Sequence, residues 1–311
     1  LWLTSDHVVE VCRARFGVPA EQAILLAEGM LNQTWRISCP DHDRVLRVGR
    51  EERTTEQVAY EYAAASAWAT VTPQLVVAEH DEAPVVDGHT LTLFPFVEGI
   101  SGTGVAGPER ARQLAPVLAA MHRASLALGL GQRPGFHAVD ESPRWFGWSH
   151  ARARIVERFG RGPDVTGPSA VVDRTIEHLD RLLDRWQATG HLSMRATVHG
   201  DLNARNQLYR DGVLVGIIDT DECRLEPLVW DIALLAHSEP DVSPHTVWRD
   251  YLAADGPLDP ADREMLAPFA RIAALSELTW LTDDAGIATH LALRNLTDIA
   301  HQLAEGGNRG G

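Results

Sequence analysis

The chain has 311 residues, 45% hydrophobic and 23% charged, which is typical of a globular protein with a core of its own. A net charge of −15 argues against nucleic acid as a partner. No run approaches the about 18 consecutive apolar residues of a membrane-spanning helix.

The N-terminal residues and the cysteines indicate the compartment. Residues 1–17 lack the basic and apolar regions of a signal peptide. Cys12, Cys39 and Cys223 are scattered without metal-binding spacing, which favours a reducing environment. We therefore expect a cytoplasmic protein.

The first hundred residues predict an antiparallel sheet with two helices. Apolar residues at helical spacing, a cap at Ser5 or Asp6 and a stop at Gly17 predict a helix over Ser5–Phe16. Alanine and glutamate predict a second helix over Glu51–Ala69. The predicted strands are Ile24–Ala27, Thr34–Ser38, Arg44–Val48, Gln74–Glu79 and Thr90–Phe94.

Beyond a glycine-rich loop at Gly99–Gly107, the pattern is mostly helical. The aromatic segment with Trp145 and Trp148 is predicted to pack in the core or to form a lid, and a box for a quaternary ammonium is the less favoured alternative. The predicted helices are Pro108–Leu128, Ala151–Phe159, Val171–Thr189, Leu228–Ala236, Val247–Leu252, Pro260–Ala285 and Ala288–Ala304.

The most informative segment is Val198–Asp231, which holds a predicted hairpin. Asp211–Gly212 is a preferred pair for a type I′ turn, because both positions need positive φ. The turn joins the strand-like runs Gln207–Arg210 and Val213–Ile218. It predicts the cross-strand pairs Arg210 with Val213, Leu208 with Val215, and Asn206 with Ile217.

The ends of this hairpin carry oxygen-bearing side chains. Asp219 is predicted to share a face with Asn206 as its diagonal neighbour, about 7–8 Å away at Cα. Two such donors suit Mg²⁺, which takes the rest of its shell from water and phosphate. Asp201, in the preceding loop, can then accept or orient the proton of an attacking hydroxyl. These residues predict phosphoryl transfer from a nucleotide.

The pattern His199-x-Asp201-x-x-x-x-Asn206, followed by Ile217-Ile218-Asp219, resembles the catalytic segment of the aminoglycoside phosphotransferase and choline kinase relatives. The resemblance implies an α+β, protein-kinase-like fold of two lobes, an antiparallel sheet with a helix and then a mostly helical part. It implies that Asp201 is catalytic and that Asn206 and Asp219 hold Mg²⁺. His199 and Asp231 would be structural, with Asp231 bracing the catalytic loop.

The same resemblance implies a nucleotide site for ATP or GTP in the N-terminal lobe. The turn that holds Gly29 and Asn32 would cover the phosphates, and Pro95, Phe96 and Val97 would form the linker that binds adenine. Arg47 stands where the family often has lysine. The chain has no lysine, so all 28 of its basic residues are arginine. Arginine can still bind phosphate as a bidentate fork. Glu61 is the predicted partner of Arg47, with Glu56 as the alternative.

The division between lobes is predicted at residues 1–97 and 98–311. The acids Asp221, Glu222 and Glu226, together with Glu239 and Asp241, follow the metal site and would suit a cationic acceptor if they face it. We therefore expect a kinase that modifies a hydroxyl of an antibiotic, such as an aminoglycoside, in resistance or self-protection. The alternatives are a metabolic sugar, choline or amino-alcohol kinase and a nucleotide-binding pseudoenzyme.

Overall fold

The computed structural model describes residues 3–28, 32–138, 168–189, 194–238 and 244–283. Its helices are α1 (Ser5–Phe16), α2 (Thr55–Ala69), α3 (Gly107–Leu128), α5 (Pro168–Thr189), α6 (Val229–Ser238), α7 (Pro244–Ala253) and α8 (Leu266–Asp283). Its strands are β1 (Gln22–Glu28), β2 (Asn32–Ser38), β3 (Arg44–Gly49), β4 (Val85–Val86), β5 (His89–Pro95), β6 (Ile100–Ser101), β7 (Arg195–Val198), β8 (Gln207–Arg210), β9 (Val213–Ile217) and β10 (Arg224–Pro227).

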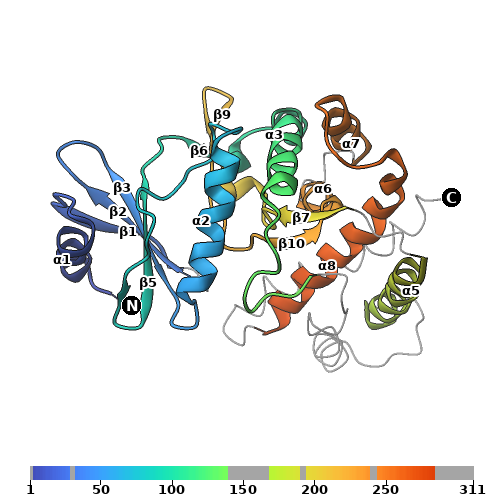
Figure 1. Ribbon diagram of the computed structural model, residues 1–311, viewed down its shortest axis with the longest axis horizontal. Coiled ribbons are helices and arrows are strands. Elements are labelled where there is room, and N and C mark those ends of the chain that lie inside the picture. The colour runs from blue at the N-terminus through green and yellow to red at the C-terminus, as the bar shows by residue number, and fades with distance from the viewer. Residues whose placement is uncertain (1–2, 29–31, 139–167, 190–193, 239–243, 284–311) are drawn as a thin grey trace.

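The N-terminal part is an antiparallel sheet in the order β1-β2-β3-β5-β4, with α1 packed on it (Figure 1). The predicted first helix is confirmed, and Gly17, with φ of 66°, ends it in the left-handed conformation. The cap is Thr4 rather than Ser5 or Asp6, because the Thr4 hydroxyl accepts the N–H of His7. Phe16 and Val8 of α1 share one apolar cluster with the sheet.

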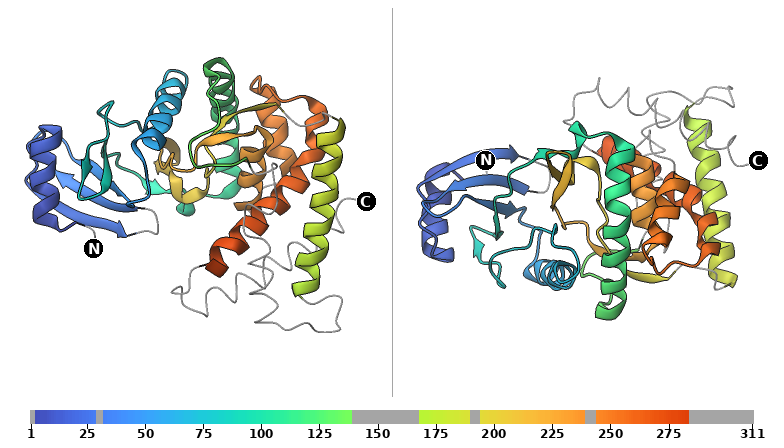
Figure 2. Two further views of the ribbon diagram at one scale, coloured as in Figure 1. Left: turned by 60° about the horizontal axis from the view of Figure 1, so that its bottom comes forward. Right: turned by 90° about the horizontal axis from the view of Figure 1, so that it is seen from above.

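Helix α2 begins later than predicted. Thr54 and Gln57 form a capping box, in which each side chain bonds the backbone N–H of the other, so the helix starts at Thr55 rather than Glu51. The buried residues Tyr60, Ala64 and Trp68 join the apolar cluster of the C-terminal part. Figures 1 and 2 show α2 beside α3, between the sheet and the helical part. The helix is therefore anchored to the C-terminal part of the molecule.

The predicted strand at Gln74–Glu79 is wrong. The N–H of Val76 donates to the carbonyl of Ile217 (2.9 Å), and the N–H of Ile217 donates to that of Gln74 (2.8 Å). The segment is an irregular connection that forms one parallel bridge, Leu75 with Ile217. The run of apolar residues 75–78 was predicted as a strand, but the backbone bonds of Gln74 and Val76 go to β9. The segment reaches the sheet at its end, where the N–H of Glu79 donates to the carbonyl of Leu93 in β5 (2.8 Å).

The C-terminal part consists of helices around two small antiparallel sheets, in the orders β6-β8-β9 and β10-β7. The chain leaves the five-stranded sheet at Pro95 and enters the second sheet at Ile100. The predicted α+β class, a sheet followed by a mostly helical part, is confirmed. Among the described helices, none is long and apolar enough to span a membrane.

Most predicted helices after Pro108 correspond to observed ones with shifted ends. The region predicted as one helix over Pro260–Ala285 starts with a 3-10 turn, Pro260–Met265, before α8. The predicted loop at Gly99–Gly107 contains β6 and a 3-10 turn at Gly102–Gly104. The predictions for Ala151–Phe159, Ala288–Ala304, Trp145 and Trp148 lie outside the described residues.

The hairpin β8–β9 has the predicted turn but a different register. Asp211 and Gly212 both have positive φ, 52° and 79°, and Arg210 pairs with Val213 as predicted. A bulge then follows, and the predicted pairs Leu208–Val215 and Asn206–Ile217 are wrong. The observed pairs are Tyr209 with Leu214, Leu208 with Gly216, and Gln207 with Ile217.

Gly216 explains the bulge, because a strand glycine often marks one. A Cβ added there would come within 3.2 Å of the Leu208 Cβ. The extra residue moves Asn206 one step along the partner strand, so its carbonyl accepts the N–H of Ile218 (3.0 Å).

Candidate active site

The loop between β7 and β8 is held by the carboxylate of Asp231. The backbone N–H groups of His199 and Gly200 each donate to it at 2.9 Å. Asp231 is fully buried in the first turn of α6, and His122 Nε2 lies 3.3 Å from it. Burial alone would raise the pKa of Asp231, but the hydrogen bond and charge of His122 lower it below its usual value. The ionised carboxylate therefore fixes the start of the loop.

His199 packs inside this loop. Its ring is buried and stacks on Trp68 with centroids 6.3 Å apart. Its Nδ1 accepts the N–H of Asp201 at 3.3 Å, and burial lowers its pKa, so the ring is neutral. His199 is placed to shape the loop.

Asp201 is the carboxylate that the loop presents. Asn203 donates to its Oδ1 (2.7 Å), and Asn206 donates to its Oδ2 (2.8 Å). Burial raises the pKa of Asp201 to about 7; the Asn203 hydrogen bond opposes the rise, and the charges of Asp219 and Glu222 add to it. A carboxyl group with a pKa near neutrality is suited to accept a proton.

Asn206 and Asp219 lie at the ends of the hairpin. The side-chain nitrogen of Asn206 donates both to the carboxylate of Asp201 and to the backbone carbonyl of Asp201 (2.9 Å). The amide oxygen of Asn206 is therefore left as a candidate cation ligand. Asp219 has a φ of 67°, so strand alternation does not set its orientation, and its carboxylate is 41% exposed.

This donor set fits Mg²⁺, which needs only one or two protein oxygens beside water and phosphate. In the described segments, no cluster of three or more His, Cys, Asp or Glu side chains could hold a metal without such help.

Arg47, on β3, meets two carboxylates of the segment after the hairpin. Its Nη1 lies 2.8 Å from both Asp219 Oδ1 and Asp221 Oδ1. Burial would lower the pKa of this guanidinium, but the charges of Asp221 and Asp219 raise it. The structure thus places Arg47 beside the candidate metal ligand.

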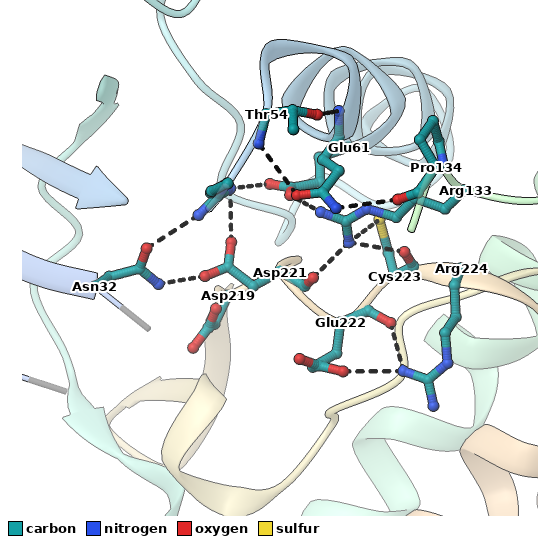
Figure 3. Close-up of polar contacts among 12 residues, drawn as sticks. Asn32, Thr54, Glu61, Arg133, Pro134, Asp219, Asp221, Glu222, Cys223 and Arg224 are labelled. Atoms are coloured by element: carbon teal, nitrogen blue, oxygen red, sulfur yellow. Dashed lines mark hydrogen bonds and ion pairs between the residues drawn. The ribbon is translucent and has the colours of Figure 1, made fainter. Parts of the chain in front are cut away.

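Glu61, on α2, is bound by other arginines. Its two carboxylate oxygens accept from Arg53 and Arg133, and its side chain is almost fully buried (Figure 3). In the described part of the chain, the predicted pair of Arg47 with Glu61 is not formed. The alternative partner, Glu56, is exposed at the start of α2.

Asp221 is the centre of the same network. Asn32 and Arg53 both reach its carboxylate, Arg53 at 2.7 Å, and Arg133 donates to its backbone carbonyl (Figure 3). Burial would raise the pKa of Asp221, but the charges of Arg47 and Arg53 outweigh it, so the pKa falls to about 2. Through Asn32 and Arg53, the Asp221 carboxylate links the segment after the hairpin to β2 and to the start of α2.

The remaining predicted nucleotide residues are partly described. Gly29 lies outside the described residues, whereas Asn32 begins β2 and bonds Arg53 (3.0 Å). Pro95 ends β5, the N–H of Phe96 donates to Asp43 (3.0 Å), and Val97 is half-buried in the connection that follows.

The predicted substrate acids are mostly paired. Glu226 is fully buried and binds Arg224 at 2.7 Å. Glu222 also meets Arg224, at 3.0 Å, but its side chain is 28% exposed. With Asp221 held as well, only Glu222 of the three retains an exposed carboxylate. Glu239 and Asp241 lie outside the described residues.

Sequence reasoning missed Asn203, Arg53 and Arg133. The capping box Thr54–Gln57 was a readable signal that Arg53 precedes the helix. Arg133 follows α3 in a loop, 4.2 Å from the Phe136 ring, and no local pattern marks it.

The fold and this site define a kinase-like phosphotransferase. The chain belongs to the phosphotransferase enzyme family, whose model matches residues 22–269. No curated protein matches the sequence significantly.

Solved structures share the fold at low identity. A spectinomycin phosphotransferase in complex with ADP and spectinomycin has a TM-score of 0.68 at 13% identity, over 98% of this chain and 99% of that one. A macrolide 2′-phosphotransferase from Brachybacterium faecium has a TM-score of 0.59 at 19% identity, over 94% and 98%. A choline/ethanolamine kinase family protein from Mesorhizobium loti has a TM-score of 0.63 at 16% identity, over 97% and 94%.

Proposed function

We propose that this phosphotransferase moves the γ-phosphoryl group of ATP or GTP to a hydroxyl of a small molecule. The observation that carries this proposal is the position of Asp201: it is held between Asn203 and Asn206, next to Asp219, on a loop fixed by Asp231. Family membership and the ADP complex of the spectinomycin phosphotransferase support the nucleotide as donor.

In this mechanism Asp201 orients the acceptor hydroxyl and takes its proton as the oxygen bonds the γ-phosphorus. The bond between the γ-phosphorus and the β-phosphate oxygen breaks, and ADP or GDP leaves. Asn206 and Asp219 would hold Mg²⁺, which supplies charge neutralisation on the phosphates. Arg47 would contact the phosphates with the guanidinium edge that its ion pairs leave free. Because the reaction depends on positioning and electrostatics, these groups suffice.

The nucleotide would lie between the sheet and the helical part, with residues 1–97 as the nucleotide-binding lobe and 98–311 as the catalytic lobe. The carbonyl of Pro95 and the N–H of Val97 would bind adenine, since Asp43 accepts the N–H of Phe96. Asn32 and Gly29 would flank the phosphates. The free cysteines fit the reducing cytoplasm, where we place the reaction.

We propose an antibiotic as acceptor, with aminoglycosides and other cationic antibiotics to be tested first, and a role in resistance or self-protection. The similarity to spectinomycin and macrolide phosphotransferases supports this choice. Glu222, which is partly exposed and influences Asp201, is the acid we place next to a cationic acceptor. A metabolic sugar, choline or amino-alcohol kinase is the second candidate, supported by the similarity to a choline/ethanolamine kinase family protein.

The test is acceptor-dependent release of ADP or GDP with Mg²⁺ across a panel of antibiotics, sugars, choline and ethanolamine. Asp201→Asn should lower turnover by at least about a hundredfold, because it removes the proton acceptor. Asp211→Asn, in the hairpin turn, is the matched control and should leave turnover unchanged, since Asn tolerates a φ of 52°.

Turnover on an antibiotic alone supports the first candidate, and turnover on a metabolite alone supports the second. Nucleotide binding without turnover on any acceptor would contradict both and favour a pseudoenzyme.

A further inference from the structure

The guanidinium of Arg47 has two carboxylate partners with different relations to the reaction. Asp219 and Asp221 both meet Nη1 at 2.8 Å. Asp219 is the proposed cation ligand, so a bound Mg²⁺ would compete with Arg47 for its carboxylate. Asp221 is buried, with a side chain 8% exposed, and takes no part in the proposed donor set. Of the two partners, Asp221 is the one that remains when Asp219 binds a cation.

Glu61 is in no position to serve Arg47 in its place. Both of its carboxylate oxygens are occupied, one by Arg53 and the other by Arg133. Its helix is also anchored to the C-terminal part, because the Tyr60 hydroxyl lies 2.9 Å from that of Thr197 and Trp68 Nε1 donates to Ser125 (2.7 Å). Moving Glu61 toward Arg47 would break these contacts as well as two buried ion pairs.

Asp221 is itself held from several sides, which a positioning group requires. Asn32 donates to Oδ2 and Arg53 meets Oδ1 (2.7 Å), while Arg133 binds the backbone carbonyl (Figure 3). The Cζ of Arg47 also lies over the Phe94 ring, 5.0 Å from its centroid. Nη1 makes the 2.8 Å contact with each carboxylate, and among the described residues Nη2 donates no hydrogen bond, so Nη2 can point to phosphate.

We propose that Asp221 is the positioning residue for Arg47 and holds its guanidinium against the nucleotide phosphates, the role that family resemblance gives to Glu61. This inference rests on the proposed function. It has a physical basis in the contacts of the side chain: Nη1 of Arg47 lies 2.8 Å from Asp221, in the segment after Asp219, whereas the Glu61 carboxylate on α2 is bound by Arg53 and Arg133. In this protein the ion pair that steadies the β3 cation therefore joins β3 to that segment.

The test is a double-mutant cycle on nucleotide binding in EDTA, with ADP and adenosine as probes and full-length protein throughout. Asp221→Asn should weaken ADP binding about tenfold and leave adenosine binding unchanged. In an Arg47→Met background the same substitution should have no further effect on ADP. The direction of the change in ADP affinity is diagnostic. If Asp221 acted only through its negative charge near the phosphates, removing that charge would tighten ADP binding.

Glu61→Gln is the matched control, since it also neutralises a buried carboxylate within the same network. Its effect on ADP binding should be the same with Arg47 and with Met at position 47. Thermal unfolding is measured for each variant, and the Asp221 cycle is sufficient if Glu61→Gln does not fold. Asp221→Glu, which restores the charge, should recover part of the ADP affinity.

Tighter or unchanged ADP binding in Asp221→Asn would overturn the inference, as would equal losses with and without Arg47. Equal weakening of ADP and adenosine would show a merely structural role and would also overturn it. A wild-type protein that binds neither ADP nor adenosine would instead refute the proposed function on which the inference rests.

Discussion

Asp201 is shaped by two asparagines that do different things. Both hydrogen bonds stabilise the ionised form, that of Asn203 at Oδ1 and that of Asn206 at Oδ2, but Asn206 is also a proposed ligand of the cation. The sequence motif identified Asn206 but not Asn203, although the two are only three residues apart. The chemistry of the carboxylate therefore depends on a neighbour that the motif does not specify.

The pKa of Asp201 predicts the pH dependence of the reaction. Only the ionised carboxylate accepts a proton, and burial raises its pKa to about 7. As pH rises through this value the active form accumulates, so kcat/KM for the nucleotide, which reports the free enzyme, should rise and level off above pH 7. In the complex with nucleotide, a cation on Asp219 would cancel the repulsion between the carboxylates of Asp219 and Asp201. This lowers the pKa of Asp201, so the rise in kcat should lie at lower pH than the rise in kcat/KM. Initial rates between pH 5 and 9 measure both limbs.

Asn203→Ala is the companion variant for this profile. Without the hydrogen bond to Oδ1 the ionised form is less stable, so both limbs should move to higher pH. A kcat/KM profile that is flat between pH 5 and 8 would show that Asp201 is not the titrating base.

At the scale of elements, the sequence predicted most helices and sheet strands but placed several ends wrongly. Periodicity identifies the long helices because each buries one apolar face. The strands β7 and β10 were missed, since each has four residues and they pair across a long separation, Val198 with Arg224. The hairpin register failed after Tyr209, because strand alternation holds only in the absence of a bulge. Gly216 was the available signal.

The positions of the charged partners could not be predicted in the same way. Arg47 and Glu61 were paired by resemblance, but their partners depend on how α2 packs and on where Asp221 lies, 174 residues beyond Arg47. A single sequence without its tertiary contacts does not contain that information locally. The loop that carries Asp201 was easier to predict, because Asp201 and Asn206 are close in sequence and bond each other directly (2.8 Å).

The loop between β7 and β8, which carries the proposed catalytic Asp201, depends on Gly200 through a close approach to the segment before β10. Gly200 has a φ of 82°, and a Cβ added there would lie 2.3 Å from the Glu222 carbonyl oxygen. Gly200→Ala should therefore displace the loop from Glu222 and abolish turnover, with a loss of stability above the about 1 kcal/mol that positive φ alone costs. Urea unfolding and ADP release measure the two effects.

Gly212→Ala is the matched control for that variant. Its φ of 79° is similar, but no atom lies within 4 Å of the added Cβ. It should lose about 1 kcal/mol of stability and keep its turnover. Equal losses of activity in the two variants would show that backbone strain alone, rather than the contact with Glu222, is responsible.

At the scale of the whole molecule, the two apolar clusters do not coincide with the sheet and the helices. One cluster joins α1 to the sheet, and the other takes α2 together with the C-terminal helices. The sheet and α2 meet through charged groups, in which Arg47, Asp221, Arg53 and Glu61 form a continuous series of ion pairs. A buried ionic contact is directional, so it fixes how the two parts are oriented more strictly than an apolar contact would.

The cysteines report on opening of that contact. Burial raises the pKa of all three thiols, that of Cys12 to about 12, so exposure is what distinguishes them. The buried Cys12 and Cys223 should be inert to alkylation at pH 8, whereas the half-exposed Cys39 should react slowly. Arg133 covers Cys223: its Nη1 donates to the Cys223 carbonyl (3.0 Å) and reaches Sγ at 4.0 Å.

Arg133→Met leaves Glu61 with one arginine instead of two, and breaking such a buried pair costs about 3–5 kcal/mol. The contact should therefore open locally, and Cys223 should be alkylated at least about tenfold faster while Cys12, in the other cluster, stays protected. Arg112→Met, at an exposed i,i+3 ion pair, is the matched control and should change neither rate. Equal acceleration of Cys12 and Cys223 would mean global unfolding, and it would contradict a charged contact that opens independently of the sheet.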